Sequence, residues 1–449
     1  MSQRNLLLLF AVLLISYACY VRAEQNPYAR HVAAGFAAID RYALQKPTDQ
    51  ELFNAAMNGM IRVLRRHGDE HSEFVDAEEE EAFNEDYDQH FGGVGLSVEI
   101  LGSPPLPTVY RAPEKGTPAD KAGISVGDRV EAIDGTMAAG LTFPEVAKML
   151  RGPVGESVKV RLRRRNVDDP IVLDIERGVI NVESILGDRR LPDGRWDFIV
   201  RQSPRIGYVR TTKFGDKTAA ELERILADLK RQNIEGLILD VRDDPGGVLD
   251  GAVKISDLFL RAGLDIVTTR DRDGVTRDRS QSSDAGDYID LPLAVLVDGN
   301  SASASEIVAA ALQDHGRAAI IGSRSYGKGT VQQIMRIESG RSLLKLTTAT
   351  YWRPSGKNIH RMPGDSPAAE WGVSPDPGLE VELDEAQYTE WREFRRRRDL
   401  ISEGTDPELA EELIRKGSPD PADYIDVPAD YVDRAVEMAV GVLEANLAK

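Results

Sequence analysis

The stretch DGNSASASEI places Ser301, Ser303 and Ser305 at alternate positions, after an apolar run and before a helix-like one. A serine at such a strand-to-helix turn is a candidate nucleophile, because backbone amides and the helix dipole there favour a developing oxyanion. Ser303 and Glu306 also form a capping-box pattern, so a purely structural interpretation makes Ser303 the N-cap of the helix that follows. The residues leave both interpretations open.

A serine hydroxyl needs a neighbouring base, because it is weakly nucleophilic until its proton is removed. Two histidines of the second half are candidates: His315 is expected about three helical turns from Ser303, and His360 lies in a loop-like stretch. The other candidate is Lys328, which stands between two glycines in GSRSYGKGTVQ. A lysine acts as a base near neutral pH only if burial lowers its pKa from about 10.4 by several units. Flanking glycines permit the close backbone packing that excludes water.

Two further motifs point to ligands that the surrounding sequence argues against. Gly322, Gly327 and Lys328 nearly spell a phosphate-binding loop, but TVQQIMRI, which follows, has the pattern of a strand rather than the required helix. HGDEH, residues 67–71, matches a zinc-peptidase spelling, but its glycine weakens the helix that such a site needs and no third ligand is evident. We therefore expect neither a metal nor a cofactor.

The secondary structure predicted for the segments that position these groups changes along the chain. Short strands separated by glycines, from residue 90 to about 177, indicate a compact module. Beyond it, GLILDVR and LPLAVLVDG are apolar runs typical of strands buried on both faces, and they alternate with helical patterns such as TAAELERILADLKRQN, which opens with a capping-box pattern at Thr218 and Glu221. This half predicts an α/β layer structure. DDPGG, residues 243–247, follows the first of these strands, where a Pro-Gly-Gly turn can point free amides into a ligand crevice.

The regions outside these two parts carry less information. The region before the module is helical and acid-rich, and ELFNAAMNGMIRVLRR places apolar residues at three- and four-residue steps: Leu52, Ala55, Ala56, Met60 and Val63. Residues 385–449 are charged and helical with proline breaks, and nothing in them suggests chemistry. Within them FRRRR, residues 394–398, has acidic residues on both sides and predicts a solvated helix face.

The composition of the 449-residue chain bears on its partners and its compartment. A formal net charge of −18 argues against nucleic acid or another polyanion as a partner. Residues 1–23 have the pattern of a secretory signal, with a basic start, an apolar run from Leu6 to Ala18 and VRA before the cleavage point; an uncleaved membrane anchor is the alternative. Cys19 is the only cysteine, so the cleaved product has neither disulfides nor a cysteine nucleophile. We expect export to the periplasm or cell envelope.

Together these motifs resemble the carboxyl-terminal processing, or tail-specific, proteases, a family of secreted serine peptidases with an embedded PDZ domain. FGGVGLSV resembles the carboxylate-binding loop of a PDZ domain, and PADKAGISVGDRVEAIDG the segment after it. VRDDPGG resembles the family's arginine-x-asparagine-proline-glycine-glycine turn, SASASEIVAAALQDHGRAAIIG its nucleophile segment and SYGKGTVQ its general-base segment. The resemblance divides the chain into a signal peptide (1–23), an N-terminal helical region (24–89), a PDZ domain (90–178), a serine protease core (179–384) and a C-terminal helical tail (385–449).

The resemblance implies a role for each residue that matches a catalytic motif. Ser303 is the nucleophile, Lys328 is the general base, and Gln332 orients the lysine. The amides of Gly246 and Ala304 form the oxyanion hole. The mechanism implied is acyl transfer through an acyl-enzyme, on an α/β core similar to that of crotonases and Clp proteases, with no metal and no cofactor.

The PDZ domain implied by the resemblance captures protein substrates by their free C-termini through strand addition. The backbone amides that meet the substrate carboxylate are those of Gly93, Val94, Gly95 and Leu96. Arg151, in KMLRG, is the candidate regulatory residue that couples capture to catalysis. An adaptor protein and a homo-oligomer are further partners that the resemblance leaves open.

Two alternatives to an active Ser-Lys protease remain. Asp244 stands where the family has asparagine, which places a carboxylate beside the oxyanion turn, and Gly247 is the alternative amide donor there. A catalytically silent PDZ adaptor that only binds peptides is the first alternative, and the presence of Ser303, Lys328 and Gln332 argues against it. A Ser-His hydrolase that uses His360 is the second, in which Lys328→Ala would leave activity largely intact.

Overall fold

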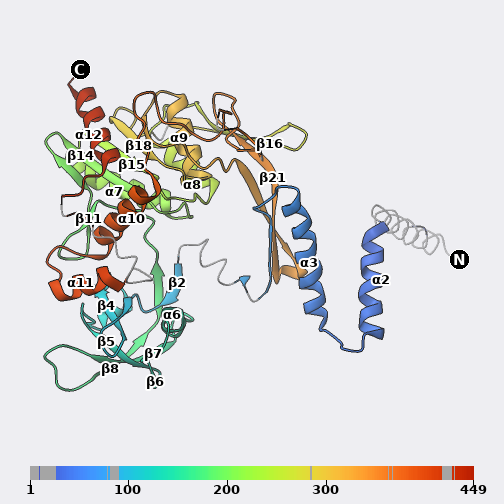
Figure 1. The fold of residues 1–449 in the computed structure, drawn as a ribbon, viewed down its shortest axis with the longest axis horizontal. Helices are drawn as coiled ribbons and strands as arrows, with labels where there is room; N and C mark the ends of the chain where they lie inside the picture. The colour runs from blue at the N-terminus through green and yellow to red at the C-terminus, as the bar shows by residue number, and fades with distance from the viewer. Residues whose placement is uncertain are drawn as a thin grey trace. The chain divides into compact units, whose positions relative to one another are not determined.

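The chain divides into two units in the computed structural model, Met1–Glu78 with Ile334–Leu346 and Glu79–Gln333 with Thr347–Lys449 (Figure 1). The predicted signal peptide, residues 1–23, lies outside the described residues except for Phe10. No helix within the described part of the chain is long and apolar enough to cross a membrane. The structure describes residues 10, 27–77, 79–80, 90–283, 286–362, 364–366, 368–416, 427–428 and 430–448.

Among its described residues, the smaller unit contains two α-helices and part of a sheet. Its elements are α2 (Pro27–Tyr42), α3 (Asp49–Arg66), β1 (Glu73–Val75), the 3-10 turn Glu338–Gly340 and the first residues of β21 (Ser342–Trp352), which pair antiparallel with β1. Thr48 and Glu51 form a capping box that begins α3. Met57 and Ile61 of α3 pack with Phe74 of β1, and these three residues form the core of the unit.

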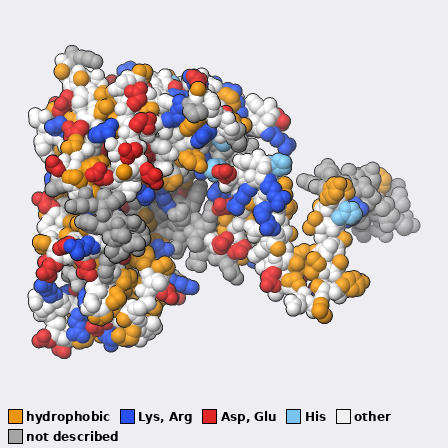
Figure 2. Space-filling view, viewed as in Figure 1, with side chains coloured by type: hydrophobic (Ala, Val, Ile, Leu, Met, Phe, Trp, Pro, Cys, Tyr) orange, Lys and Arg blue, Asp and Glu red, His pale blue; other side chains and the backbone are white. Residues whose placement is uncertain are grey.

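The apolar steps of the sequence do not mark the buried face of α3. Met60 and Val63 are 57% and 48% exposed, because β1 packs on the neighbouring face, which carries Met57 and Ile61. Helix α2 buries none of its residues. Figure 2 shows hydrophobic side chains exposed along it, among them Tyr28, Val32, Ile39 and Tyr42.

The glycine-rich module is a β-sheet domain with two short helices. Its sheet has the order β3-β4-β5-β7-β8, with β6 paired to β5, so β3 forms an edge. The small side chains of Val109, Val130, Val158 and Val160 are completely buried between the sheet and the helices. The elements are β2 (His90–Gly93), β3 (Ser97–Leu101), β4 (Leu106–Arg111), α5 (Pro118–Lys121), β5 (Arg129–Ile133), β6 (Thr136–Met137), α6 (Phe143–Leu150), β7 (Ser157–Arg163), β8 (Ile171–Glu176) and β9 (Gly178–Asn181).

The second half is an α/β layer structure, as the sequence predicts. Strands β14, β15, β18 and β19 run parallel in the order β10-β14-β15-β18-β19, with β13 beside β14. Because side chains alternate along a strand, Leu237 and Leu239 of β15 pack under α7, α8 and α9, whereas Ile238 packs under α12 on the other face. The elements are β10 (Ile185–Leu186), β13 (Ile199–Gln202), β14 (Arg205–Thr211), α7 (Thr218–Arg231), β15 (Gly236–Asp240), α8 (Leu249–Asp257), β18 (Leu293–Val297), α9 (Ala304–Asp314), β19 (Ala319–Gly322) and α12 (Arg434–Leu447).

The capping box predicted for α7 is wrong. Thr218 lies inside the helix, and its hydroxyl and the Glu221 carboxylate both bond to Ser184, a residue of a preceding segment. These two polar side chains therefore join α7 to its neighbour instead of closing its first turn.

The remaining elements flank the parallel sheet. Strand β16 pairs with both β17 and β21, and β20 also pairs with β21. The strand predicted after Lys328 is β20, which agrees with the argument against a phosphate-binding loop. The elements are β11 (Arg189–Arg190), β12 (Trp196–Asp197), β16 (Asp265–Asp271), β17 (Thr276–Gln281), β20 (Thr330–Ile337), α10 (Glu385–Leu400) and α11 (Pro407–Lys416).

Candidate active site

The structure distinguishes the three serines of DGNSASASEI. Ser301 and Ser305 are fully buried, and their hydroxyls donate to the carbonyls of Val241 at 2.7 Å and of Asp244 at 3.0 Å. Ser303 has φ +56° and ψ −112°, a backbone conformation that residues other than glycine rarely adopt. Such conformations concentrate at functional sites, so the geometry favours Ser303 as the reactive serine and assigns its two neighbours structural roles.

The Glu306 carboxylate joins the segment that carries Ser303, the serine segment, to the segment that carries Lys328, the lysine segment. It is fully buried, and its Oε2 accepts the backbone amides of Ser303 at 2.9 Å and Lys328 at 2.8 Å. Its Oε1 accepts the Gly327 amide at 2.7 Å and the Ser325 hydroxyl at 2.5 Å. Burial raises the pKa of Glu306 to about 7, although these four donors favour the carboxylate. One side chain thus fixes the backbones of both candidate catalytic residues.

Lys328 is half-buried between two glycines that lie in close contact with other backbone. A Cβ at Gly329 would lie 2.2 Å from the backbone nitrogen of His360, and a Cβ at Gly327 would lie 2.8 Å from the Trp371 ring. The two glycines therefore pack closely against their neighbours, and the exclusion of water from the Lys328 amine stays a prediction. The contact at Gly329 also places His360 beside the lysine segment, and burial lowers the pKa of that histidine.

The other candidate ligands and bases lie elsewhere. His315 is the C-cap of α9, and its Nε2 donates to the Asp265 carbonyl at 2.7 Å. His67 is the C-cap of α3. Among the residues that the structure describes, no three or more histidine, cysteine, aspartate or glutamate side chains gather so that they could hold a metal.

The turn at residues 243–247, which we predict to form part of the oxyanion hole and call the oxyanion turn, lies directly against Ser303. Gly246 has φ +87°, and a Cβ there would lie 2.4 Å from the Ala302 oxygen, 2.7 Å from the Ala304 nitrogen and 2.8 Å from Cβ of Ser303. Only glycine permits this approach. Ala304 is the first residue of α9, where a backbone amide lacks a partner inside the helix. The two amides proposed for the oxyanion hole therefore belong to segments in contact.

Asp244 is fully buried inside this turn and accepts hydrogen bonds from its neighbours. Its Oδ1 accepts the Gly246 amide at 2.8 Å, and its backbone carbonyl accepts the Ala302 amide at 3.0 Å. Burial raises the pKa of Asp244 to about 7. In this structure the Gly246 amide therefore bonds to a carboxyl group within its own turn.

Gln332 lies on β20, and its carboxamide nitrogen donates to the hydroxyls of Thr330 at 2.8 Å and Thr347 at 3.3 Å. Thr330 and Gln332 are two residues apart in β20, the strand that follows Lys328, so their side chains lie on the same face of this strand. The role of Gln332 in orienting Lys328 remains a prediction.

The residues predicted to bind a peptide carboxylate are Gly93, the last residue of β2, and residues 94–96, which connect β2 to β3. Gly95 has φ +79°, and a Cβ there would lie 2.8 Å from Cβ of Thr117. Strand β3 follows at an edge of its sheet, and helix α11 of the tail contacts this strand. The guanidinium of Arg151 lies 4.1 Å from the centre of the Phe91 ring in β2, next to this loop.

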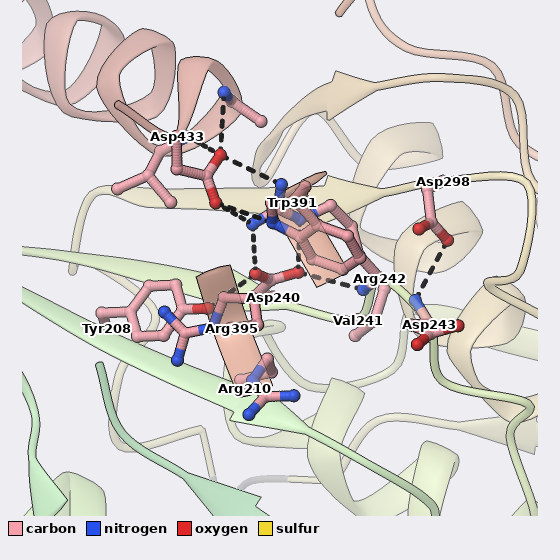
Figure 3. Close-up of polar contacts among 12 residues, drawn as sticks. Tyr208, Arg210, Asp240, Val241, Arg242, Asp243, Asp298, Trp391, Arg395 and Asp433 are labelled. Atoms are coloured by element: carbon pink, nitrogen blue, oxygen red, sulfur yellow. Dashed lines mark hydrogen bonds and ion pairs between the residues drawn. The ribbon is translucent and has the colours of Figure 1, made fainter. Parts of the chain in front are cut away.

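Sequence reasoning missed the side chains of the C-terminal tail that lie around the turn. Tyr388 of α10 donates to Asp243 in the turn. Asp433, the N-cap of α12, accepts from Arg242, the residue before the turn, and from the indole N–H of Trp391 in α10 (Figure 3). The available signal was a tryptophan and a tyrosine at three-residue spacing in an otherwise charged helix. Glu306 gave a clearer signal, because a lone acid in the apolar helix SEIVAAAL has to find donors.

Comparisons with known proteins agree with this architecture. Residues 205–377 match Peptidase family S41, and residues 109–164 match the PDZ domain. A carboxy-terminal-processing protease of Bartonella bacilliformis is 37% identical over 371 residues, which cover 81% of this chain and 78% of that protein. The carboxy-terminal processing protease CtpA of Bacillus subtilis is 32% identical, over 71% of this chain and 63% of that protein. The solved structure of a photosystem II D1 C-terminal processing protease aligns with a TM-score of 0.42 and 26% identity, over 78% of this chain and 92% of that one.

The fold and these relatives define the class of protein, a serine-type peptidase with a PDZ domain. The chain belongs to peptidase family S41, among the carboxy-terminal-processing proteases. The predictions of the family, the fold class and the type of enzyme are confirmed.

Proposed function

We propose that this chain is an exported endopeptidase that captures the free C-termini of proteins through its PDZ domain and hydrolyses peptide bonds with a Ser303–Lys328 dyad. The observation that supports the dyad is the Glu306 carboxylate, whose Oε2 binds the backbone amides of both residues. The PDZ part is supported by the glycine loop and by β3, the edge strand that follows this loop. The names of the relatives agree with action at C-termini.

The reaction begins with the neutral amine of Lys328. It takes the proton of the Ser303 hydroxyl while Oγ attacks the scissile carbonyl. The carbonyl oxygen becomes an oxyanion, which the Ala304 amide and an amide of the turn, Gly246 or Gly247, stabilise. The peptide C–N bond then breaks, and the new amino terminus leaves with the proton that Lys328 had taken.

The acyl-enzyme is resolved by water through the reverse roles. Lys328 takes a proton from the water, whose oxygen attacks the ester carbon, and it returns that proton to Oγ of Ser303 as the bond between Oγ and the acyl carbon breaks. Gln332, on the strand after the lysine loop, orients the amine in both steps. Arg151, stacked on Phe91 beside the peptide loop, couples capture to catalysis.

The test uses an unfolded protein with an apolar free C-terminus as the substrate, and the same protein with an amidated C-terminus as the control. The wild type should cleave the free form and cleave the amidated form more slowly. Ser303→Ala and Lys328→Ala should cleave neither. Activity that persists in Lys328→Ala would favour His360 as the base and overturn the dyad.

A silent PDZ adaptor is the second candidate, and one observation favours it. The Gly246 amide bonds to Asp244 rather than pointing into an open site, so one proposed oxyanion donor is occupied. An adaptor would bind the free C-terminus and leave the substrate intact under every condition in which the wild type is folded.

Export and association complete the proposal. The signal pattern of residues 1–23 supports export to the periplasm or cell envelope, and mass spectrometry of the protein recovered from cells would show whether cleavage follows Ala23. The exposed apolar side chains of α2 support a homo-oligomer, which sedimentation of the wild type and of a Val32→Glu variant would test. An adaptor protein that delivers substrates is the further partner that we propose.

A further inference from the structure

Side chains of the C-terminal tail hold the oxyanion turn, although the tail lies beyond the match to Peptidase family S41. Asp243, the first residue of the turn, has φ +55°, a conformation that is uncommon outside glycine. Its Oδ1 accepts the Tyr388 hydroxyl at 2.8 Å and the Asn300 side-chain amide at 3.0 Å, and its Oδ2 lies 3.4 Å from Arg392. Tyr388 and Arg392 both belong to α10. Three donors therefore fix a carboxylate at the strained start of the turn.

The residue before the turn is also anchored by the tail. Arg242 is 4% exposed, and it pairs with Asp240 at the end of β15 and with both oxygens of Asp433, at 3.1 Å and 2.8 Å (Figure 3). Trp391 donates its indole N–H to Asp433 at 3.0 Å, and its ring lies 4.6 Å from the Arg242 guanidinium. Burial alone would raise the pKa of Asp433, but Arg242 holds it below the usual range. The tail thus supplies a counter-charge for a buried arginine.

The same contacts extend to the loop that leads to the nucleophile. Asn300, three residues before Ser303, donates to Asp243 and also contacts the Tyr388 hydroxyl. Asp298 accepts the Asp243 amide at 3.0 Å. Tyr388 and Asn300 border a cavity of about 250 Å³. Open space therefore adjoins the tyrosine, whose hydroxyl bonds to Asp243 and Asn300.

We propose that the C-terminal helices position the oxyanion turn for catalysis, with Tyr388 acting through Asp243 and Asp433 acting through Arg242. This inference rests on the proposed function, because the turn affects the rate only if its amide stabilises the oxyanion beside Ser303. Both anchors lie within four residues of Gly246, so their loss shifts the amide relative to the nucleophile. Tyr388 and Asp433 are positioning residues, since neither touches the reacting atoms.

Tyr388→Phe is the variant that tests this proposal, because it removes one hydroxyl and keeps the ring. Removing a whole oxyanion donor costs about 10²–10³ in kcat, so a displaced donor should cost about ten-fold. We expect that fall in kcat with KM changed by less than about two-fold, since substrate binding is untouched. Tyr431→Phe is the matched control, a tail tyrosine whose ring packs on Phe394 instead, and it should keep the wild-type kcat.

Two further variants separate positioning from a general loss of stability. In an Asp243→Ala background, Tyr388→Phe should have no additional effect on kcat, because its acceptor is already gone. Asp433→Asn keeps the shape of the tail but halves the counter-charge of Arg242, and it should lower kcat in the same way as Tyr388→Phe. Independent, additive losses of kcat in the double variant would overturn the proposal.

Hydrogen–deuterium exchange of residues 240–248 gives a readout that needs no activity. Tyr388→Phe should exchange faster in this segment than the wild type and than Tyr431→Phe. If the wild type cleaves nothing, the proposed function fails, yet the exchange still decides whether the tail holds the turn. Unchanged exchange in both Tyr388→Phe and Asp433→Asn would overturn the inference whether or not the enzyme cleaves.

Discussion

Glu306→Gln is expected to separate the serine segment from the lysine segment. The Glu306 carboxylate accepts three backbone amides and the Ser325 hydroxyl, two donors on each oxygen. Glutamine keeps one accepting oxygen and turns an amino group toward the other two donors. Two buried donors then lose their acceptor, at about 1–3 kcal/mol each, so the total is about 2–6 kcal/mol. Because the donors belong to the segments of Ser303 and Lys328, moving these segments apart is the way to relieve that cost.

The assay is steady-state cleavage of a peptide substrate well below the melting temperature of the variant. A cost of about 2 kcal/mol on the assembled site corresponds to a fall in kcat of about 30-fold, which is the smallest effect that we expect. Glu221→Gln is the matched control, because Glu221 is a partly buried glutamate of α7 that accepts the backbone amide and the hydroxyl of Ser184. That control should lower the melting temperature and keep the wild-type kcat.

The reasoning about Glu306 fails if Glu306→Gln keeps both the wild-type kcat and the wild-type melting temperature. A lower melting temperature with unchanged kcat would also contradict it, since Glu306 would then stabilise the fold without holding the two segments in register.

Three other predictions follow from the turn, the lysine loop and the peptide loop. Burial raises the pKa of Asp244 from 3.8 to about 7, so the folded state binds this proton more tightly than the unfolded state, and stability falls as the pH rises through that range. Asp244→Asn should remove this pH dependence. At pH 8 its free energy of unfolding should exceed that of the wild type by up to about 4 kcal/mol, whereas at pH 3 the two should not differ in this way. Gly329→Ala places a Cβ 2.2 Å from the His360 backbone and should lower both kcat and the melting temperature, whereas Gly299→Ala, with its nearest atom at 4.0 Å, should change neither melting temperature nor fold. Gly95→Ala, at φ +79° and 2.8 Å from Thr117, should weaken binding of a free C-terminal peptide by at least about ten-fold in a fluorescence polarisation titration; equal affinity would contradict the assignment of the peptide loop.

Local patterns in the sequence predicted the elements that carry the chemistry. The apolar run of β15, the helix after Ser303 and the strand after Lys328 all formed as expected, because each depends on residues within about ten positions. The choice among the three serines could not be made from local pattern. Ser301 and Ser305 are distinguished by bonds to the Val241 and Asp244 carbonyls, some 60 residues earlier in the chain.

The tail shows where sequence reasoning failed, and why. Residues 394–398 were predicted to be a solvated basic face, yet Arg395 is 4% exposed and its guanidinium pairs with Asp188 and Asp399. A charge pattern shows neither a partner some 200 residues away nor which face of a helix meets the core. No local pattern predicted that Tyr388 and Asp433 join the tail to Asp243 and to Arg242, across 145 and 191 residues.

The central claim is that Lys328 activates Ser303, and the most direct measurement is labelling with a serine-reactive fluorophosphonate followed by peptide mapping. The account predicts one adduct, on Ser303, in the wild type and in His360→Ala, and none in Lys328→Ala. An adduct on Ser301 or Ser305, or undiminished labelling of Ser303 in Lys328→Ala, would contradict it.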